Sequence, residues 1–118
     1  MKVLIVDDSP SIRKEVAQAL TQVGYEVVQA VDGADGIAKI DQERPAAVIC
    51  DVNMPRMNGL EMLEAIRREP RHAALPVVML TSEGQPALIE RAKKAGARGW
   101  LVKPFRTDLL VAAVATLV

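Results

Sequence analysis

Short runs of hydrophobic residues, each about the length of a β-strand, are the clearest pattern in this sequence. Four of them are apolar at nearly every position, as in central strands of a parallel sheet that is covered on both faces. The segment from Tyr25 to Val31 alternates enough between apolar and polar residues to indicate a strand at the sheet edge. The expected strands are residues 2–6, 25–31, 46–51, 77–80 and 99–102.

Between these runs, apolar residues recur at helical spacing, and turn residues mark the ends. Ser9 and Pro10 provide a helix cap and a first-turn proline after the first strand, and Gly24 ends that helix. The later helices are expected from Asp32-Gly33 to just before Pro45, from Gly59 to about Glu69, from Gly84–Pro86 to Gly96, and from about Arg106 to Val118. Alternating strands and helices predict an α/β fold with a parallel sheet, right-handed crossovers and helices on both faces.

The last helix is more apolar than one buried face requires. Residues at helical spacing should pack on the sheet, and the rest should form an apolar surface of the kind that usually marks an interface. The inward set is Leu110, Ala113, Val114 and Leu117, and the outward set is Leu109, Val111, Ala112, Ala115 and Val118.

Composition narrows the class of protein. A chain of 118 residues is long enough for one domain, expected to span residues 1–118. Its 15 basic and 15 acidic side chains cancel, which argues against nucleic acid or a membrane surface bound by bulk charge. Cys50 is the single cysteine and lies in an apolar run, which favours a buried, inert thiol. With no signal peptide and no segment long enough to span a bilayer, a cytoplasmic protein is expected.

Polar residues follow the apolar runs where each expected strand ends. Asp7-Asp8, Asp51, Thr81-Ser82 and Lys103-Pro104 stand at four such ends. Any one of these pairs alone would be interpreted as a turn or a helix cap. Because the carboxyl ends of parallel strands share one edge, where open α/β sheets bind ligands, their repetition predicts a site that gathers carboxylates, a hydroxyl and an ammonium group.

Neighbouring carboxylates at Asp7, Asp8 and Asp51 would repel one another unless a cation neutralised them. Mg²⁺ suits such a site, because it takes one or two protein carboxylates and keeps its other positions for carbonyl, water and phosphate oxygens. Lys103 would then face a phosphoryl oxygen, and Thr81 could donate its hydroxyl to another.

These motifs, in this order and spacing, resemble the receiver domains of two-component response regulators. The resemblance rests on Ile5-Val6-Asp7-Asp8-Ser9, Val31-Asp32-Gly33, Asp51-Val52-Asn53-Met54-Pro55 with Asn58-Gly59, Leu80-Thr81-Ser82, and the stretch from Gly96-Ala97 through Trp100-Leu101 to Lys103-Pro104-Phe105. It covers the whole chain. It implies a flavodoxin-like (βα)5 three-layer sandwich, with a five-stranded parallel sheet of strand order 2-1-3-4-5.

The resemblance also implies a role for each site residue. Asp51 would accept a phosphoryl group from a histidine kinase. Asp8, Asp51 and the carbonyl of Asn53 would bind Mg²⁺, and Asp7 would hold the ion through water. Thr81 and Lys103 would bind the phosphoryl oxygens, with Lys103-Pro104 as a cis peptide, which proline tolerates.

Some positions refine or depart from the family pattern. Trp100 stands where the family usually has Tyr or Phe as the aromatic that turns inward on activation. Asn53 and Glu83 occupy positions that tune the lifetime of the acyl phosphate, and this pair occurs in chemotaxis-type regulators, whose phosphate is short-lived. Ser82 stands where alanine is common and is interpreted as neutral. His72 is expected to be exposed and far from the site.

The function implied is a stand-alone, phosphorylation-activated switch of the chemotaxis or motility type. It would not be an enzyme but a phosphoacceptor that assists its own phosphorylation and dephosphorylation. Expected partners are a histidine kinase or phosphotransfer protein, a protein target on the face formed by the fourth helix, fifth strand and fifth helix, and a second copy in a weak homodimer. A phosphorelay intermediate, or a receiver domain that is part of a longer response regulator, is the alternative.

Two other classes fit the residues less well. An aspartyl-phosphate phosphatase also needs Mg²⁺ and an aspartate after a strand, but Asp51-Val52-Asn53 lacks its second acid. A flavin carrier can share the fold, since fold alone does not decide function. Asp7-Asp8 would repel a flavin phosphate, however, and the expected loop is not rich in Ser, Thr and Gly.

Overall fold

A computed structural model of the protein describes residues 1–82 and 86–118, and strands alternate with helices along this part of the chain. The elements are β1 (Lys2–Val6), α1 (Pro10–Gln22), β2 (Glu26–Ala30), α2 (Gly33–Glu43), β3 (Ala47–Asp51), α3 (Gly59–Arg67), the 3₁₀ turn η1 (Pro70–His72), β4 (Val77–Thr81), α4 (Pro86–Lys94), β5 (Gly99–Val102) and α5 (Thr107–Leu117). The α/β class predicted from sequence is confirmed. The second strand is one residue shorter at each end than its alternating pattern suggested.

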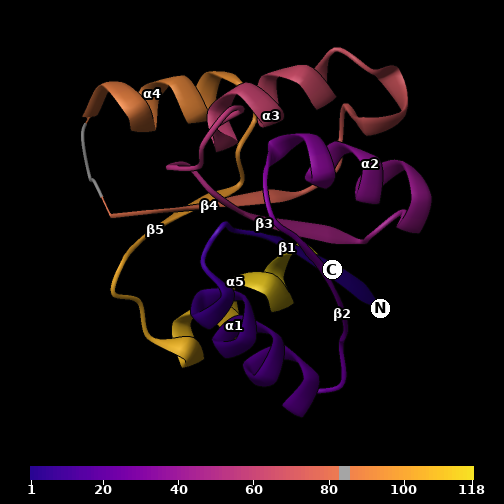
Figure 1. Cartoon of the computed structure of the whole chain (residues 1–118), viewed down its shortest axis with the longest axis vertical. Coiled ribbons are helices and arrows are strands. Elements are labelled where there is room, and N and C mark those ends of the chain that lie inside the picture. The colour runs from indigo at the N-terminus through magenta and orange to yellow at the C-terminus, as the bar shows by residue number, and fades with distance from the viewer. Residues whose placement is uncertain (83–85) are drawn as a thin grey trace.

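The five strands form one parallel sheet in the order β2-β1-β3-β4-β5 (Figure 1). Residues Val3 to Val6 of β1 pair with Ala47 to Cys50 of β3, and β3 pairs in turn with β4. The order reverses beside β1, so β1 and β3 run side by side although their crossovers leave in opposite directions. This is the strand order that the family resemblance implied, and it places the ends of β1 and β3 next to each other at the switch point.

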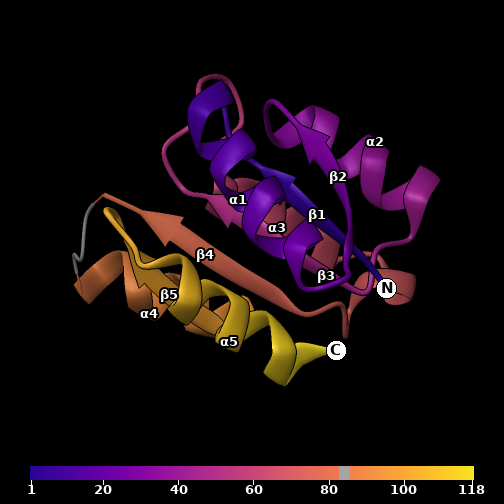
Figure 2. The same cartoon turned by 90° about the horizontal axis from the view of Figure 1, so that it is seen from below.

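Helices cover both faces of the sheet, so the molecule has three layers. Helices α2, α3 and α4 lie on one face and α1 and α5 on the other (Figures 1 and 2). Residues of β1 alternate between the two cores: Leu4 and Val6 pack toward α2 and α3, whereas Val3 and Ile5 pack toward α1 and α5. The strand is therefore apolar at successive positions because both of its faces are buried.

Capping residues set where the helices next to the carboxyl edge begin. The Ser9 hydroxyl accepts a hydrogen bond from the Ile12 N–H at the start of α1, and Asp32 accepts one from Asp35 N–H at the start of α2. Asn58 and Glu61 form a reciprocal capping box at α3. Each cap directly follows a strand-to-helix loop, so these side chains fix the lengths of the loops that border the site.

The last helix differs in one respect from the expected inward and outward sets. Leu110 and Val114 are fully buried, and Leu109 is half exposed at 51%, as expected. Val111 was expected to point outward, but it is partly buried and packs against the core that α5 shares with α1. The expectation was wrong for Val111 because α5 packs against α1 as well as against the sheet.

Within the described residues, none of the helices is both long enough and apolar enough to cross a membrane.

Candidate functional site

The polar residues that follow the strands do meet at one edge of the sheet. Asp51 ends β3 and Thr81 ends β4, while Asp7 follows β1 and Lys103 follows β5. Parallel strands place all of these positions at the carboxyl edge. Asp7 and Thr81 have no exposed surface and Asp51 has 3%, so three polar groups are buried there, whereas Asp8 is exposed at the rim.

Lys103 brings a positive charge to this edge. Its Nζ lies 3.0 Å from Asp7 Oδ2 and 3.3 Å from Asp51 Oδ1, so one ammonium group bridges two carboxylates. The Lys103 N–H donates to the Thr81 carbonyl at 2.6 Å, which ties the loop after β5 to the end of β4. The Lys103–Pro104 peptide is cis, as the resemblance implied.

Three carboxylates crowd the other side of the site. One oxygen from each of Asp7, Asp8 and Asp51 lies within 4.8 Å of the others. Burial, together with the neighbouring Asp7 charge, raises the pKa of Asp51 to about 6 in spite of Lys103. Burial by itself lowers the pKa of Lys103, but its hydrogen bond to Asp7 and the charges of Asp51 and Asp7 outweigh that effect and raise it. One lysine therefore does not neutralise the cluster.

A hard divalent cation fits this donor set. Oxygen ligands of like charge, held close together with only partial neutralisation, are what Mg²⁺ requires from a protein. Burial and the neighbouring Asp7 charge both raise the pKa of Asp51, and a cation bound beside it would favour its ionised form. Asp8 and Asp51 are placed to supply carboxylate oxygens, and the loop that begins at Asn53 passes directly beside them.

Asn53 connects this loop to the end of β4. Its N–H lies 3.4 Å from Asp51 Oδ1, and its side-chain Nδ2 donates to Thr81 Oγ1 at 3.5 Å and to Ser82 Oγ at 3.3 Å. Ser82, which the sequence suggested was neutral, is therefore an anchor for the Asn53 amide. An alanine at this position would lack that anchor.

Two further groups that sequence reasoning missed hold the acidic turn. Arg13 Nη1 donates to the Asp7 carbonyl at 2.6 Å, and the Ser9 N–H donates to Asp7 Oδ1 at 2.9 Å. Arg13 comes from the second turn of α1, and its position in the sequence carries no motif that would have revealed the contact.

Gly59 lets the start of α3 approach the backbone of Asp51. A Cβ at Gly59 would collide with the Asp51 carbonyl, so a glycine is needed for this close contact.

Trp100 and Cys50 lie away from the cluster of polar groups at the carboxyl edge. Trp100 packs on the core shared with α3 and α4, and its indole N–H is buried with no hydrogen-bond partner among the described residues. Glu83 lies outside the described residues, so its expected role remains a prediction. Cys50 is buried, and burial raises the pKa of its thiol above the ordinary range, which agrees with the inert thiol expected from sequence.

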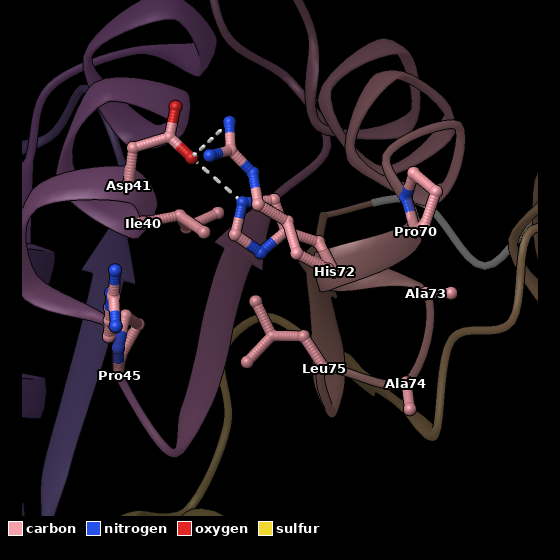
Figure 3. Close-up of a pocket in the computed structure, with 10 residues that line it drawn as sticks. Ile40, Asp41, Pro45, Pro70, His72, Ala73, Ala74 and Leu75 are labelled. Atoms are coloured by element: carbon pink, nitrogen blue, oxygen red, sulfur yellow. Dashed lines mark hydrogen bonds and ion pairs between the residues drawn. The ribbon is translucent and has the colours of Figure 1, made fainter.

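A pocket of about 580 Å³ lies at the opposite, amino edge of the sheet, between the end of α2 and the turn before β4 (Figure 3). Asp41 Oδ1 lies there 2.8 Å from His72 Nε2 and 3.1 Å from Arg71 Nη2, and the His72 hydrogen bond lowers the pKa of Asp41. His72 was expected to be exposed, but its side chain is only 12% exposed because it packs toward α2. Asp41 contacts both basic side chains, so these three residues join α2 to η1. Their charges are used within the cluster and offer little to a ligand.

The charge imbalance at Asp51 predicts a stability difference that depends on pH. The folded-state pKa of about 6 lies above that of an unfolded aspartate. The contribution of the Asp51 carboxyl to the free energy of unfolding is therefore at its full value below about pH 4, where the group is protonated, and is lost as the pH rises through 6. We expect metal-free Asp51→Asn to be more stable than the wild type by roughly 1–3 kcal/mol near pH 8. Urea unfolding in a chelator at several pH values measures this gain, which should shrink toward about pH 4. A wild type that is the more stable protein at pH 8 would contradict it.

The comparisons with known proteins agree with this geometry. A sequence model of the response regulator receiver domain matches residues 3–115. Chemotaxis protein CheY1 of Helicobacter pylori is 39% identical over 112 residues, which cover 93% of this chain and 90% of that protein. A probable chemotaxis protein CheY of Rhizobium etli is 38% identical over 115 residues, covering 97% and 89% of the two chains. The solved structure of the chemotaxis response regulator CheY4 of Vibrio cholerae has a TM-score of 0.92 and 43% identity, and it covers 99% of this chain and 98% of that one. This protein therefore belongs to the response regulator receiver domain family.

Proposed function

We propose that this protein is a signalling switch that is turned on when Asp51 accepts a phosphoryl group from a histidine kinase or phosphotransfer protein. The observation that carries the proposal is the placement of Asp51. It is a buried carboxylate at the end of the middle strand, 3.3 Å from the Lys103 ammonium group and beside two further carboxylates. Family membership supports the same assignment.

The transfer is a displacement at phosphorus. An Asp51 carboxylate oxygen attacks the phosphorus of a phosphohistidine, the P–N bond breaks, and its electron pair remains on the imidazole, which takes up a proton. The product is an acyl phosphate on Asp51. Hydrolysis turns the switch off: a water molecule attacks the same phosphorus and loses a proton, the P–O bond to Asp51 breaks, and the Asp51 carboxylate and inorganic phosphate are released. In this proposal the protein assists both steps by positioning and charge, which is the main contribution of proteins to phosphoryl transfer.

Each polar residue of the site has a part in that step. Lys103 would move from its bridge between Asp7 and Asp51 toward a phosphoryl oxygen, and Thr81 would donate its hydroxyl to another. Mg²⁺, when bound, supplies positive charge that offsets the negative charge of the carboxylates and of the incoming phosphoryl group. Asp8 and Asp51 and the Asn53 carbonyl would bind it directly, and Asp7 would contact it through water.

The conformational change would be transmitted from Thr81 to Trp100. Thr81 ends β4, and Trp100 lies on the adjacent strand β5, where it pairs with Met79 two residues before Thr81. The buried indole N–H without a described partner costs on the order of 1–3 kcal/mol, which the protein would recover if the ring turned to a position where that N–H is satisfied. Movement of Thr81 toward a phosphoryl group would then favour rotation of Trp100, as in other two-state switches biased by local charge.

The lifetime of the phosphorylated state would depend on Asn53 and Glu83. The Asn53 side chain is held at the mouth of the site by Ser82 and Thr81, which supports a role for its amide in orienting the attacking water. Glu83 is assigned from the family pattern alone. A short lifetime would suit a signal that cycles rapidly.

The output would be a protein target bound on the face formed by α4, β5 and α5. Val102 of β5 and Leu109 of α5 expose 47% and 51% of their surfaces on these elements, which supports an interface there. The relatives named as chemotaxis proteins support a chemotaxis or motility pathway, and we place the protein in the cytoplasm as part of the same proposal. A weak homodimer through the same face, a phosphorelay role, and a place within a longer response regulator remain alternatives to be tested by partner binding.

Phosphorylation itself is the first test. With Mg²⁺ and a small acyl-phosphate donor, the wild type should gain the mass of one phosphoryl group, whereas Asp51→Asn should not, because the nucleophile is gone. Asp8→Ala should need more Mg²⁺ for the same yield. Asp41→Asn, which removes a carboxylate at the opposite edge, is the matched control and should be phosphorylated normally. A stable phosphoryl adduct on Asp51→Asn would show that another residue is the acceptor.

Trp100, the single tryptophan, should report the switch by fluorescence. Adding Mg²⁺ with beryllofluoride, a phosphoryl mimic, should change the emission and the access of a soluble quencher, because the indole environment changes when the ring rotates. Asp51→Asn is the control that cannot form the adduct and should show no change beyond that of Mg²⁺ alone. Identical emission and quenching in the wild type before and after the mimic would rule out the rotation but not the phosphorylation.

The third test concerns lifetime. Asn53→Leu keeps the backbone carbonyl but removes the amide that contacts Ser82 and Thr81. We expect phosphorylation to persist and dephosphorylation to slow several-fold, because the water would lose an orienting group. Decay of the phosphorylated mass after removal of the donor measures the rate, and Gln42→Leu, an exposed amide on α2, is the control. Equal decay rates for both variants and the wild type would remove Asn53 from this role.

A further inference from the structure

The turn between β2 and α2 presses against the loop that carries the expected metal-binding carbonyl. A Cβ added at Gly33 would lie 2.7 Å from Met57 Cγ, 2.9 Å from Met57 Cβ and 2.9 Å from the Met57 backbone oxygen. Gly33 does not have a positive φ, so its backbone conformation would accept any residue. Glycine is required at this position because the β3–α3 loop occupies the space that a side chain would need.

The turn is rigid enough to act as a support. Asp32 accepts a hydrogen bond from the Asp35 N–H at 2.8 Å, and Asp35 in return accepts one from the Val31 N–H at 3.0 Å. Gly33 is buried at the first residue of α2, and α2 packs against β1, β2 and α3. The surface that meets Met57 is therefore backbone held by secondary structure on both sides.

The loop, in contrast, has its own fixed points only near its ends. Asn53 is held by Asp51 and by the end of β4, and Asn58 is fixed by its capping box with Glu61. Between them, Arg56 has a φ of 67°, a left-handed conformation that costs a non-glycine residue on the order of 1 kcal/mol or more. Such a conformation persists only where surrounding contacts enforce it.

Two contacts join the middle of the loop to the turn, and they differ in strength. Arg56 Nη1 lies 3.5 Å from Asp32 Oδ2, but its side chain is 86% exposed, and exposed ion pairs contribute little. Met57 is partly buried and packs on the core beside the turn, so its contact with Gly33 excludes water. The steric contact at Gly33 is therefore the stronger of these two supports for the middle of the loop.

From these contacts we infer that Gly33, fixed at the start of α2 by the Asp32 cap, is a positioning residue for the metal site: it supports the middle of the β3–α3 loop, whose residue Asn53 carries the carbonyl expected to bind the cation. This inference rests on the proposed function, because that function requires the divalent cation. It also explains a motif, Val31-Asp32-Gly33, whose side chains do not themselves reach the carboxyl-edge cluster.

The test is Gly33→Ala, measured as Mg²⁺ affinity by calorimetry on the unphosphorylated protein. The added methyl group meets a backbone oxygen, which no rotamer change can move, so the loop has to shift. We expect the dissociation constant for Mg²⁺ to rise about ten-fold, the low end of the effect of changes next to a metal's own ligands. Faster hydrogen exchange in residues 53–58 of the metal-free protein should accompany it.

Two variants separate this effect from a general loss of stability. Gly99→Ala is the matched control, because its Cβ would meet Val78 only at 3.4 Å, an ordinary contact, and its Mg²⁺ affinity should equal that of the wild type. Met57→Ala removes the side chain that rests on Gly33 without inserting a new atom. This variant should weaken Mg²⁺ binding and speed hydrogen exchange in residues 53–58, while urea unfolding shows that it is folded. If Gly33→Ala does not fold, Met57→Ala takes its place as the test.

The outcomes distinguish the inference from the function on which it rests. A wild type that binds no Mg²⁺ would overturn the proposed function itself. A wild type that binds Mg²⁺, with unchanged affinity in both Gly33→Ala and Met57→Ala, would overturn only the positioning role of the turn. Weaker binding with faster exchange in the loop, at wild-type affinity in Gly99→Ala, would support it.

Discussion

The balance of charge around Asp51 is the constraint on which the rest of this structure depends. A carboxylate with 3% of its surface exposed stands beside the fully buried Asp7, and one ammonium group, Lys103, lies within 3.3 Å of both. Removing ionised groups from water is costly unless they are paired, and here two buried negative charges share one positive charge. The metal-free site therefore carries an excess of buried negative charge, which a divalent cation would reduce.

Such a site can be built only on a scaffold that supplies stability elsewhere. Asp7 follows β1, and Asp51 and Thr81 end β3 and β4. These strands are buried on both faces, and their apolar residues provide the two cores that hold the sheet. Burial of each large apolar side chain contributes about 1.5–3 kcal/mol, so a few residues behind each polar group offset its cost. The polar groups thus lie at the ends of neighbouring strands in one sheet, which limits how far they can relax from one another.

The loops around the site are positioned by backbone packing as much as by hydrogen bonds. Gly59 allows the start of α3 to contact the Asp51 carbonyl, and Gly33 allows the β3–α3 loop to rest on α2. Both glycines are needed for close approach and not for conformational freedom. Arg13 adds a third support by donating to the Asp7 carbonyl. The catalytic geometry that we propose therefore depends on residues that never touch the phosphoryl group.

Much of this could be predicted from sequence, and the remainder could not, for a definite physical reason. The order of apolar runs, caps and turn residues determined the α/β class, because periodicity and capping act over a few neighbouring residues. The polar residues after each run determined which groups would meet, since parallel strands share a carboxyl edge. Tertiary structure alone decided that Val111 and His72 are partly buried, that Ser82 holds Asn53, and that Met57 rests on Gly33. These contacts join residues far apart in the sequence, such as His72 and Asp41, which are 31 positions apart, and no local pattern records which side chains the packing of helices will bring together.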